Sequence, residues 1–252
     1  IMLDINGILG IAAIIGGLKH GTPRYNLSAA NSFVAMLIVA VGVGMFIPDF
    51  VPDAQWKIYS AISVGVMAIM YMGFLRLQTV EHRDFFEHKA ATDEEAHDPA
   101  HSPIQNIVIM IGAIVLVGVL AEVLSALLDA GLEGTGLPKS IPAVLVALIS
   151  ASPEILTALN AAKHDRLQTT VNIALGASLA TVLLTLPVIE GMALFTGERI
   201  VMALTPMQGG MLLLTLLAVM NNLHDGETNA IEGISHLALF AAFVALVVMG
   251  LL

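Results

Sequence analysis

The chain of 252 residues has no cysteine and few charged residues. Without cysteine it can form neither a disulfide framework nor a cysteine-based metal or redox site. Charged residues make up 12 % of the sequence, whereas a typical soluble domain has about 25 %. Apolar residues make up 57 %, and the mean hydropathy is +0.88. This composition excludes an ordinary soluble domain and predicts an integral membrane protein.

The sequence also lacks a recognisable leader at its start. No positively charged stretch followed by a cleavage site precedes the first apolar run, so we predict no signal peptide. Since the chain begins with Ile1, we expect it to be part of a longer gene product. The net charge of −10 comes largely from one polar segment and therefore says little about binding partners.

Long apolar runs are abundant, and they alternate with short polar breaks. Because a helix needs about 20 apolar residues to cross a bilayer, these runs predict eight membrane-spanning helices in an all-α polytopic membrane protein. The helices are expected at residues 2–18, 31–48, 57–79, 104–128, 140–162, 169–191, 205–222 and 230–252. The only long break is the acidic linker, residues 80–103, which separates three helices from five.

The positions of lysine and arginine predict the orientation, because short loops rich in these residues stay in the cytoplasm. A cytoplasmic loop after the first helix puts most of them on that side: Lys19, Arg24, Arg76, Arg83, Lys89, Lys163 and Arg166. The other side has only Lys57, Lys139 and Arg199. We therefore expect a multi-pass protein of the inner (plasma) membrane, with the acidic linker in the cytoplasm and the C-terminus outside.

Two of the predicted helices share the pattern Asn-x-x-Leu-Gly, from Asn6 to Gly10 and from Asn172 to Gly176. The second and third helices then match the seventh and eighth in order and spacing. A chance match between apolar helices is the alternative. Repeats of five helices cross the membrane in opposite senses, which is typical of secondary transporters.

The repeat divides the chain into three parts. Residues 1–79 would be the last three helices of a first repeat, residues 80–103 the linker, and residues 104–252 a complete second repeat. Two further spans, with a second acidic site, are then expected before Ile1.

The strongest candidate for an ion ligand is Glu154, in the stretch ISASPEILTAL. A carboxylate in the middle of an apolar span is costly and is by default a functional hypothesis. Pro153 is expected to break or kink the helix directly before it. Ser150 and Ser152 add hydroxyl oxygens, and hard oxygen ligands suit Ca²⁺ or Na⁺. The alternative is a protonated Glu154 bonded to a neighbouring helix beside a simple kink.

Further ligands could come from the neighbouring helices. Glu122 either lines an outward-facing path or is an interfacial carboxylate that reaches water. Asn172 and Ser178 could face Glu154 and complete an ion shell, whereas packing alone would explain Gly176, because small residues let helices approach closely.

The remaining ionisable residues have more ordinary interpretations. We expect solvated positions at helix ends for Glu190, Glu198 and Glu232, and an interhelical hydrogen bond for His236. Asp4 has no interpretable context. The linker is either a solvated, disordered segment or a sensor of pH or divalent ions. Its histidines are His82, His88, His97 and His101.

The run SASPEILTALNAAKHDRLQTTVNIALGASLATVLLTLPV resembles the second signature repeat of the cation/proton exchanger branch of the calcium/cation antiporter superfamily. In that branch Gly-Asn-Ala-Ala-Glu is followed by a basic turn, Leu-Gly-Ser and a late Leu-Pro. NGILGIAAIIGGLKHG, LQTVEHRDFFEH and GISHLALFAAF further resemble the bacterial ChaA-type calcium(sodium, potassium)/proton antiporters. The resemblance covers essentially the whole chain.

The resemblance implies inverted repeats and roles for single residues. Glu154 takes the place of the second-repeat glutamate that binds the cation and exchanges it for protons. Glu122 matches an acidic residue common in the preceding helix, and Gly176 falls on the glycine of the Leu-Gly-Ser turn. The family's first-repeat glutamate is not among these residues.

The sequence departs from the calcium exchangers beside the motif. Ser150 and Ala151 replace Gly-Asn, Ile155 replaces a histidine and Ala180 replaces a glutamine. Fewer polar ligands leave Na⁺ and K⁺ open besides Ca²⁺.

These residues together predict a secondary active antiporter that exports Ca²⁺, Na⁺ or K⁺ in exchange for H⁺ by alternating access. It would not be an enzyme, since no serine is paired with a histidine at one depth. A non-transporting membrane subunit or scaffold is the alternative. We expect the lipid bilayer, the transported cations and protons as partners, with no cofactor and no nucleic acid, and homo-oligomerisation stays open.

Overall fold

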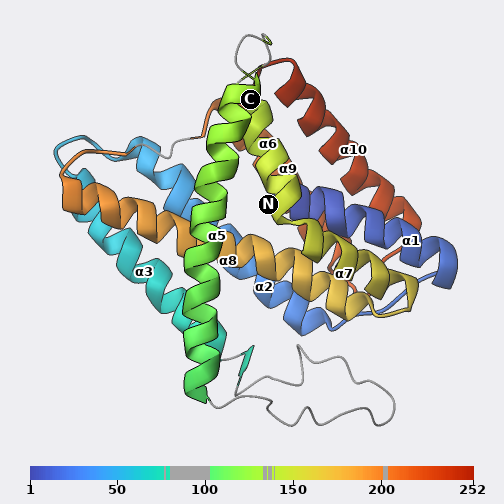
Figure 1. Ribbon diagram of the computed structural model, residues 1–252. Helices are drawn as coiled ribbons and strands as arrows, with labels where there is room; N and C mark the ends of the chain where they lie inside the picture. Colours follow the sequence, from blue (N-terminus) through green and yellow to red (C-terminus); the bar gives the residue numbers. More distant parts are fainter. Residues whose placement is uncertain (77, 80–102, 133–134, 136–137, 139, 201–203) are drawn as a thin grey trace.

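The computed structural model describes residues 1–252 except 77, 80–102, 133–134, 136–137, 139 and 201–203 (Figure 1). Nearly the whole acidic linker and all four of its histidines lie outside the described residues. Both interpretations of the linker therefore stay predictions.

Helices make up most of the described chain. They are η1 (Met2–Leu9), α1 (Gly10–His20), α2 (Leu27–Val41), η2 (Gly42–Phe46), η3 (Ile47–Phe50), α3 (Trp56–Arg76), α5 (Pro103–Leu132), α6 (Ser140–Ser150), α7 (Ser152–Lys163), α8 (Leu167–Thr196), α9 (Pro206–Asn222) and α10 (Ala230–Val248). η1 and η2 are π-helical and η3 is a 3₁₀ turn. The β structure of the described residues is one isolated antiparallel bridge, between Arg24 and Glu227.

Each predicted membrane span corresponds to a helix or to consecutive helices. Within the described residues, six helices are long and apolar enough to cross a membrane, and the bent pair α6–α7 makes a seventh if it is one span. α9 has 17 residues, which is at the short end of the range of about 17 to 25. The prediction of an all-α polytopic membrane protein is confirmed.

The long helix α8 runs through the centre of the bundle (Figure 1). It contacts α1, α2, α3, α7 and η1. Its apolar face packs on α2 and α3, where Phe33 and Phe74 place their ring centroids 5.3 Å apart. Leu175, Leu179 and Met67 are fully buried beside them. Since lipid tails are as apolar as these side chains, close packing stabilises the contact rather than removal from water.

The helix contacts agree with the predicted repeat, in which η1–α1 corresponds to α8, α2 to α9 and α3 to α10. η1 and α1 pack against α10 as α8 packs against α3. η1 packs against α9 as α8 packs against α2. The pairs η1–α8 and α2–α9, which map onto themselves, are also in contact. Two units related by a twofold axis in the membrane plane would give this pattern.

The connections on one side of the bundle are tied together. Arg24, between α1 and α2, forms an ion pair of 2.8 Å with Glu227, between α9 and α10. The Tyr25 hydroxyl donates to the Glu227 carbonyl at 2.9 Å. Burial, and to a lesser degree nearby carboxylates, raise the pKa of Tyr25 above its usual value, so this hydroxyl keeps its proton. Lys19 donates to the Lys163 carbonyl at 2.7 Å, which brings the α7–α8 turn to the same side.

The connections on the opposite side are joined through Arg199, which follows α8. Its guanidinium pairs with Asp53, between η3 and α3. It also donates to the carbonyls of Pro48 and Val51, each at 3.2 Å. The loops thus alternate between two sides in the order that the predicted spans require. Which side faces the cytoplasm stays a prediction.

α1 and α10 approach each other almost backbone to backbone. A Cβ atom added at Gly233 would lie 2.6 Å from both the carbonyl oxygen of Gly10 and the backbone nitrogen of Ile14. One added at Gly17 would overlap the backbone nitrogen of Ala230. Only glycine allows this separation, and such small residues are typical of tight helix pairs in membranes.

Candidate ion-binding site

The predicted helix break before Glu154 is present. α6 ends at Ser150 and α7 begins at Ser152, and the two helices are bent by 55°. Between them Ala151 has φ −82° and ψ 0°, outside helical geometry. Pro153 explains the break, because it lacks a backbone N–H and its ring would clash with the carbonyl one turn earlier.

Glu154 therefore lies in the first turn of α7 rather than in the middle of a continuous helix. The free N–H groups at a helix start carry partial positive charge, which favours a carboxylate there. The side chain of Glu154 is exposed. Its oxygens are thus accessible at the helix break, as an ion ligand requires.

The two predicted serine ligands are also exposed, and each donates to a carbonyl of α6, so that the bond of Ser152 crosses the break. Ser150 donates to the Ala147 carbonyl at 3.1 Å, and Ser152 to the Leu148 carbonyl at 2.8 Å. Each hydroxyl uses its proton in this way and keeps its lone pairs available. Their role as ligands stays a prediction.

On α8, Ser178 contacts a carboxylate other than Glu154. It is fully buried and donates to Oδ2 of Asp4 in η1 at 2.8 Å. Because η1 contacts both α7 and α8, Asp4 lies on a helix that touches the two helices of the predicted site. The sequence pattern gave no reason to select Asp4, because only three residues precede it and they do not show its surroundings.

Asn172 lies near the start of α8, and Gly176 lies one turn further along the same helix. The Asn172 side chain accepts a hydrogen bond from Gln168 at 2.7 Å. An added Cβ at Gly176 would meet the Phe33 ring at an ordinary 3.6 Å. Gly176 is therefore next to the packed core, and whether Asn172 or Gly176 contributes an ion ligand remains a prediction.

η1 holds a second buried polar group, built around Asn6. The Asn6 amide donates to Thr215 Oγ1 of α9 at 2.7 Å, and its carbonyl oxygen lies 2.9 Å from Nδ1 of His236 on α10. Because the amide oxygen can only accept, Nδ1 carries the proton. The expected interhelical hydrogen bond of His236 is confirmed. Its partner, 230 residues away, could not be identified from the sequence.

The other acidic residues differ in their surroundings. Glu122 is exposed on α5, and Glu198 is exposed after α8. Glu232 accepts hydrogen bonds from Thr228 at 2.8 Å and Asn229 at 2.9 Å at the start of α10. The expectation of a solvated Glu190 is wrong, because α8 extends to Thr196 and Glu190 is only 5 % exposed.

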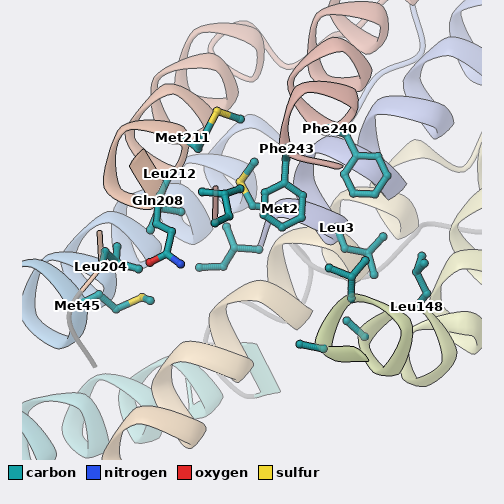
Figure 2. Close-up of a pocket in the computed structure, with 15 residues that line it drawn as sticks. Met2, Leu3, Met45, Leu148, Leu204, Gln208, Met211, Leu212, Phe240 and Phe243 are labelled. Carbon is teal, nitrogen blue, oxygen red and sulfur yellow. The ribbon is translucent and has the colours of Figure 1, made fainter. Parts of the chain in front are cut away.

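A large apolar cavity does not suit a cation. It has a volume of about 390 Å³ and lies between η1, α6, α9 and α10 (Figure 2). Met2, Leu3, Leu148, Phe240 and Phe243 point into it, whereas Gln208 is its one strongly polar side chain. An ion needs several oxygen ligands. The cavity is therefore distinct from the site near Glu154.

In the part of the chain that the structure describes, acidic and histidine side chains form no group of three or more that could hold a metal ion.

A polytopic bundle with a broken helix, an acidic residue at the break and symmetric helix contacts defines a secondary transporter of the inverted-repeat class. Residues 105–249 match the sodium/calcium exchanger protein family. The chain belongs to this family.

Relatives and a solved structure agree with this assignment. The chain is 32 % identical to the y4hA protein of Sinorhizobium fredii, over 98 % of this chain and 69 % of that protein. It is 30 % identical to the sodium-potassium/proton antiporter ChaA of Escherichia coli, over 97 % of this chain and 69 % of that protein. The Ca²⁺/H⁺ antiporter ChaA of Bacillus subtilis is 24 % identical over 92 % of this chain and 68 % of that protein. The structure of native YfkE has the same fold, with a TM-score of 0.73, 19 % identity, and coverage of 98 % of this chain and 72 % of that one.

Proposed function

We propose that this protein is a cation/proton antiporter in which Glu154 binds Ca²⁺, Na⁺ or K⁺ in exchange for protons. The observation that carries the proposal is the accessible carboxylate of Glu154 at the break between α6 and α7. The names of the relatives in Escherichia coli and Bacillus subtilis also support antiport over a non-transporting membrane subunit. They leave the choice among the three cations open.

Exchange follows from competition for one carboxylate. Glu154 can hold a proton or help to hold a cation, but it cannot do both at once. If only the loaded states change the side from which the site is open, cation and proton move in opposite directions. Alternating access then comes from rocking or gating of one helix bundle against another around the fixed site.

The ligand set of the proposal has two parts. Glu154 with Ser150 and Ser152 forms the part at the α6–α7 break, and Glu122 is a further acidic group on the preceding helix. Ser178, Asn172 and Gly176 belong to α8. We add Asp4 of η1 to the second part, because it accepts the Ser178 hydroxyl at 2.8 Å and supplies a second carboxylate.

The remaining features of the proposal concern topology. The tied loops around Arg24, Lys163 and Glu227 face the cytoplasm, in agreement with the excess of lysine and arginine there. Residues 1–79 belong to a first repeat and residues 104–252 to a second, joined by the linker. The lipid bilayer is the partner of the exposed apolar helix faces.

The test is proton-driven cation uptake into everted membrane vesicles, with Ca²⁺, Na⁺ and K⁺ compared. Glu154→Gln removes the charge with almost no change in shape, so we expect loss of uptake for every transported cation while the amount of folded protein stays the same. The matched control Glu198→Gln changes an exposed carboxylate outside the site and should leave uptake unchanged. Near-normal uptake by Glu154→Gln would refute the assignment.

A second measurement separates transport from a scaffold role. The full-length protein, reconstituted alone in liposomes, should move protons when a transported cation is added. Absence of such flux from folded protein would favour the non-transporting subunit.

A further inference from the structure

The C-terminal part of α8 contains a buried carboxylate that the proposed cation site does not use. Glu190 is 5 % exposed, and its Oε1 accepts a hydrogen bond from the fully buried Ser63 of α3 at 3.4 Å. Its Oε2 is inaccessible and has no hydrogen-bond partner among the described residues. An ionised carboxylate in this position is strongly destabilised, because burial removes its water and nothing replaces it. Oε2 therefore needs something to bind.

A small cavity beside Glu190 limits what that can be. Its volume is about 20 Å³, and a cavity of roughly 10 to 15 Å³ or more can hold one water molecule. It is lined by Pro48, Val51, Trp56, Tyr59, Ser60, Arg199 and Ile200. The space suits a single water molecule and is too small for a hydrated metal ion.

The charges that face Glu190 also argue against a metal cation. Arg199 lines the same cavity, from the segment after α8, and its counter-ion is Asp53 from the segment before α3. On α3, Lys57 lies near the turn after α8, and the Tyr59 hydroxyl is committed to a backbone carbonyl at 2.6 Å. The guanidinium group of Arg199 repels any cation, but a proton, unlike a metal ion, binds to one carboxylate oxygen and needs no further shell of oxygen ligands.

We propose that Glu190 is a second proton-binding site of the antiporter, filled through this cavity from the aqueous side at the end of α8. A hydronium ion in the cavity gives up its proton to the Glu190 carboxylate, which forms an O–H bond and leaves a neutral water molecule in the cavity. Release of the proton is the reverse step. This proposal rests on the proposed antiport and adds to it a proton site apart from the cation site.

The charge of Glu190 has a consequence for the packing around it. The neutral acid is compatible with close contact between α8 and α3, because it has no charge that requires hydration. The ionised form draws in more water and loosens this contact. Binding of a proton is thereby coupled to closure of the bundle at this side.

The test compares two kinds of flux through the full-length protein in liposomes. Glu190→Gln keeps the shape and the acceptor for Ser63 but cannot bind a proton. We expect cation flux driven by a proton gradient to fall on the order of 100-fold, the lower end of the contribution of a positioned proton-transfer group. Exchange of labelled for unlabelled cation at equal pH needs no proton and should stay unchanged. Glu198→Gln, at the same end but exposed, should alter neither flux.

The outcomes separate this proposal from the antiport itself. An equal fall of both fluxes in Glu190→Gln, or no fall in either, would overturn the proton site. Loss of both fluxes is instead the expectation for Glu154→Gln, and a wild-type protein without any exchange would refute the antiport.

Infrared spectroscopy gives a readout that does not depend on transport. The wild type should show the C=O band of a protonated carboxylic acid, which Glu190→Gln removes and Glu198→Gln keeps. Ser63→Ala should shift this band to higher frequency, because the C=O group loses its hydrogen bond. If the wild type has no such band at any pH, or if the band ignores Ser63→Ala, Glu190 is not the proton site.

Discussion

Polar side chains lie within the membrane both in η1, the π-helical start of the first span, and at the break between α6 and α7. The two regions differ in how far these side chains are buried. At η1, Asn6 is completely buried and is bonded to two other helices. At the break, Glu154 and Ser152 are exposed, and the serine donates across the break to the Leu148 carbonyl of α6. Irregular helices are frequent at functional sites, yet of the Asn6 group and the break only the break has exposed side chains that can take a ligand.

The difference shows how one protein can use interrupted helices for two purposes. In η1, Asn6 bonds to Thr215 and His236 and so specifies how α9 and α10 sit against the first span. At the break, the hydroxyls of Ser150 and Ser152 bond only to nearby carbonyls of α6, within one predicted span. Substitutions in the first region should therefore change stability, and substitutions in the second should change transport.

Asn6→Ala should have the largest effect on stability. It leaves the buried Nδ1–H of His236 without an acceptor, which costs about 1 to 3 kcal/mol, and removes a hydrogen bond to Thr215 worth about 1 kcal/mol, so we expect a loss of about 2 to 4 kcal/mol. Thermal unfolding in detergent, followed by the fluorescence of Trp56, measures it. Asn160→Ala, an exposed asparagine on α7, is the control and should be neutral. A fully stable Asn6→Ala protein would remove the distinction between the two regions.

Pro153→Ala should act on transport instead. Alanine supplies the missing N–H and removes the clash, so α6 and α7 can join into a straighter helix. We expect proton-driven uptake to fall about tenfold, or about 1.4 kcal/mol, with unchanged or higher thermal stability. Pro187→Ala is the matched control, because Pro187 lies inside α8 without interrupting it. Equal effects of the two substitutions would show that the break has no special role.

The smallest expected effect is that of Ser152→Ala, which is compared with Ser178→Ala. Ser178→Ala removes the hydrogen bond to Asp4 and should cost about 1 to 2 kcal/mol of stability. Ser152→Ala removes an exposed bond to the Leu148 carbonyl and should stay within about 0.5 kcal/mol. The same unfolding measurement compares them directly. If Ser152→Ala proved the more destabilising of the two, the contrast between the regions would be reversed.

The sequence allowed most of the helices to be predicted, because each apolar run is long enough to be recognised as a membrane-spanning helix. α3 was expected at residues 57–79 and spans Trp56–Arg76, and α9 was expected at residues 205–222 and spans Pro206–Asn222. The break at Ala151 was predictable too, since proline acts locally. These features depend on neighbouring residues and need no knowledge of the fold.

The errors have a different origin. Glu190 seemed to lie at a helix end because the apolar run weakens there, but α8 continues to Thr196 and packs its last turns on α3. The pairs Asn6–His236 and Asp4–Ser178 join residues far apart in the chain. A single sequence contains no signal for such contacts, because any polar side chain in a span can bond to any helix that packs against it.

The glycines that join α1 to α10 also restrict how the protein can move. With Gly233 against the backbone of Gly10 and Ile14, the two helices interlock too closely to slide or tilt past each other without a clash. The two helices must therefore move together as one rigid body. We expect the moving surface of the transport cycle to lie at other helix contacts.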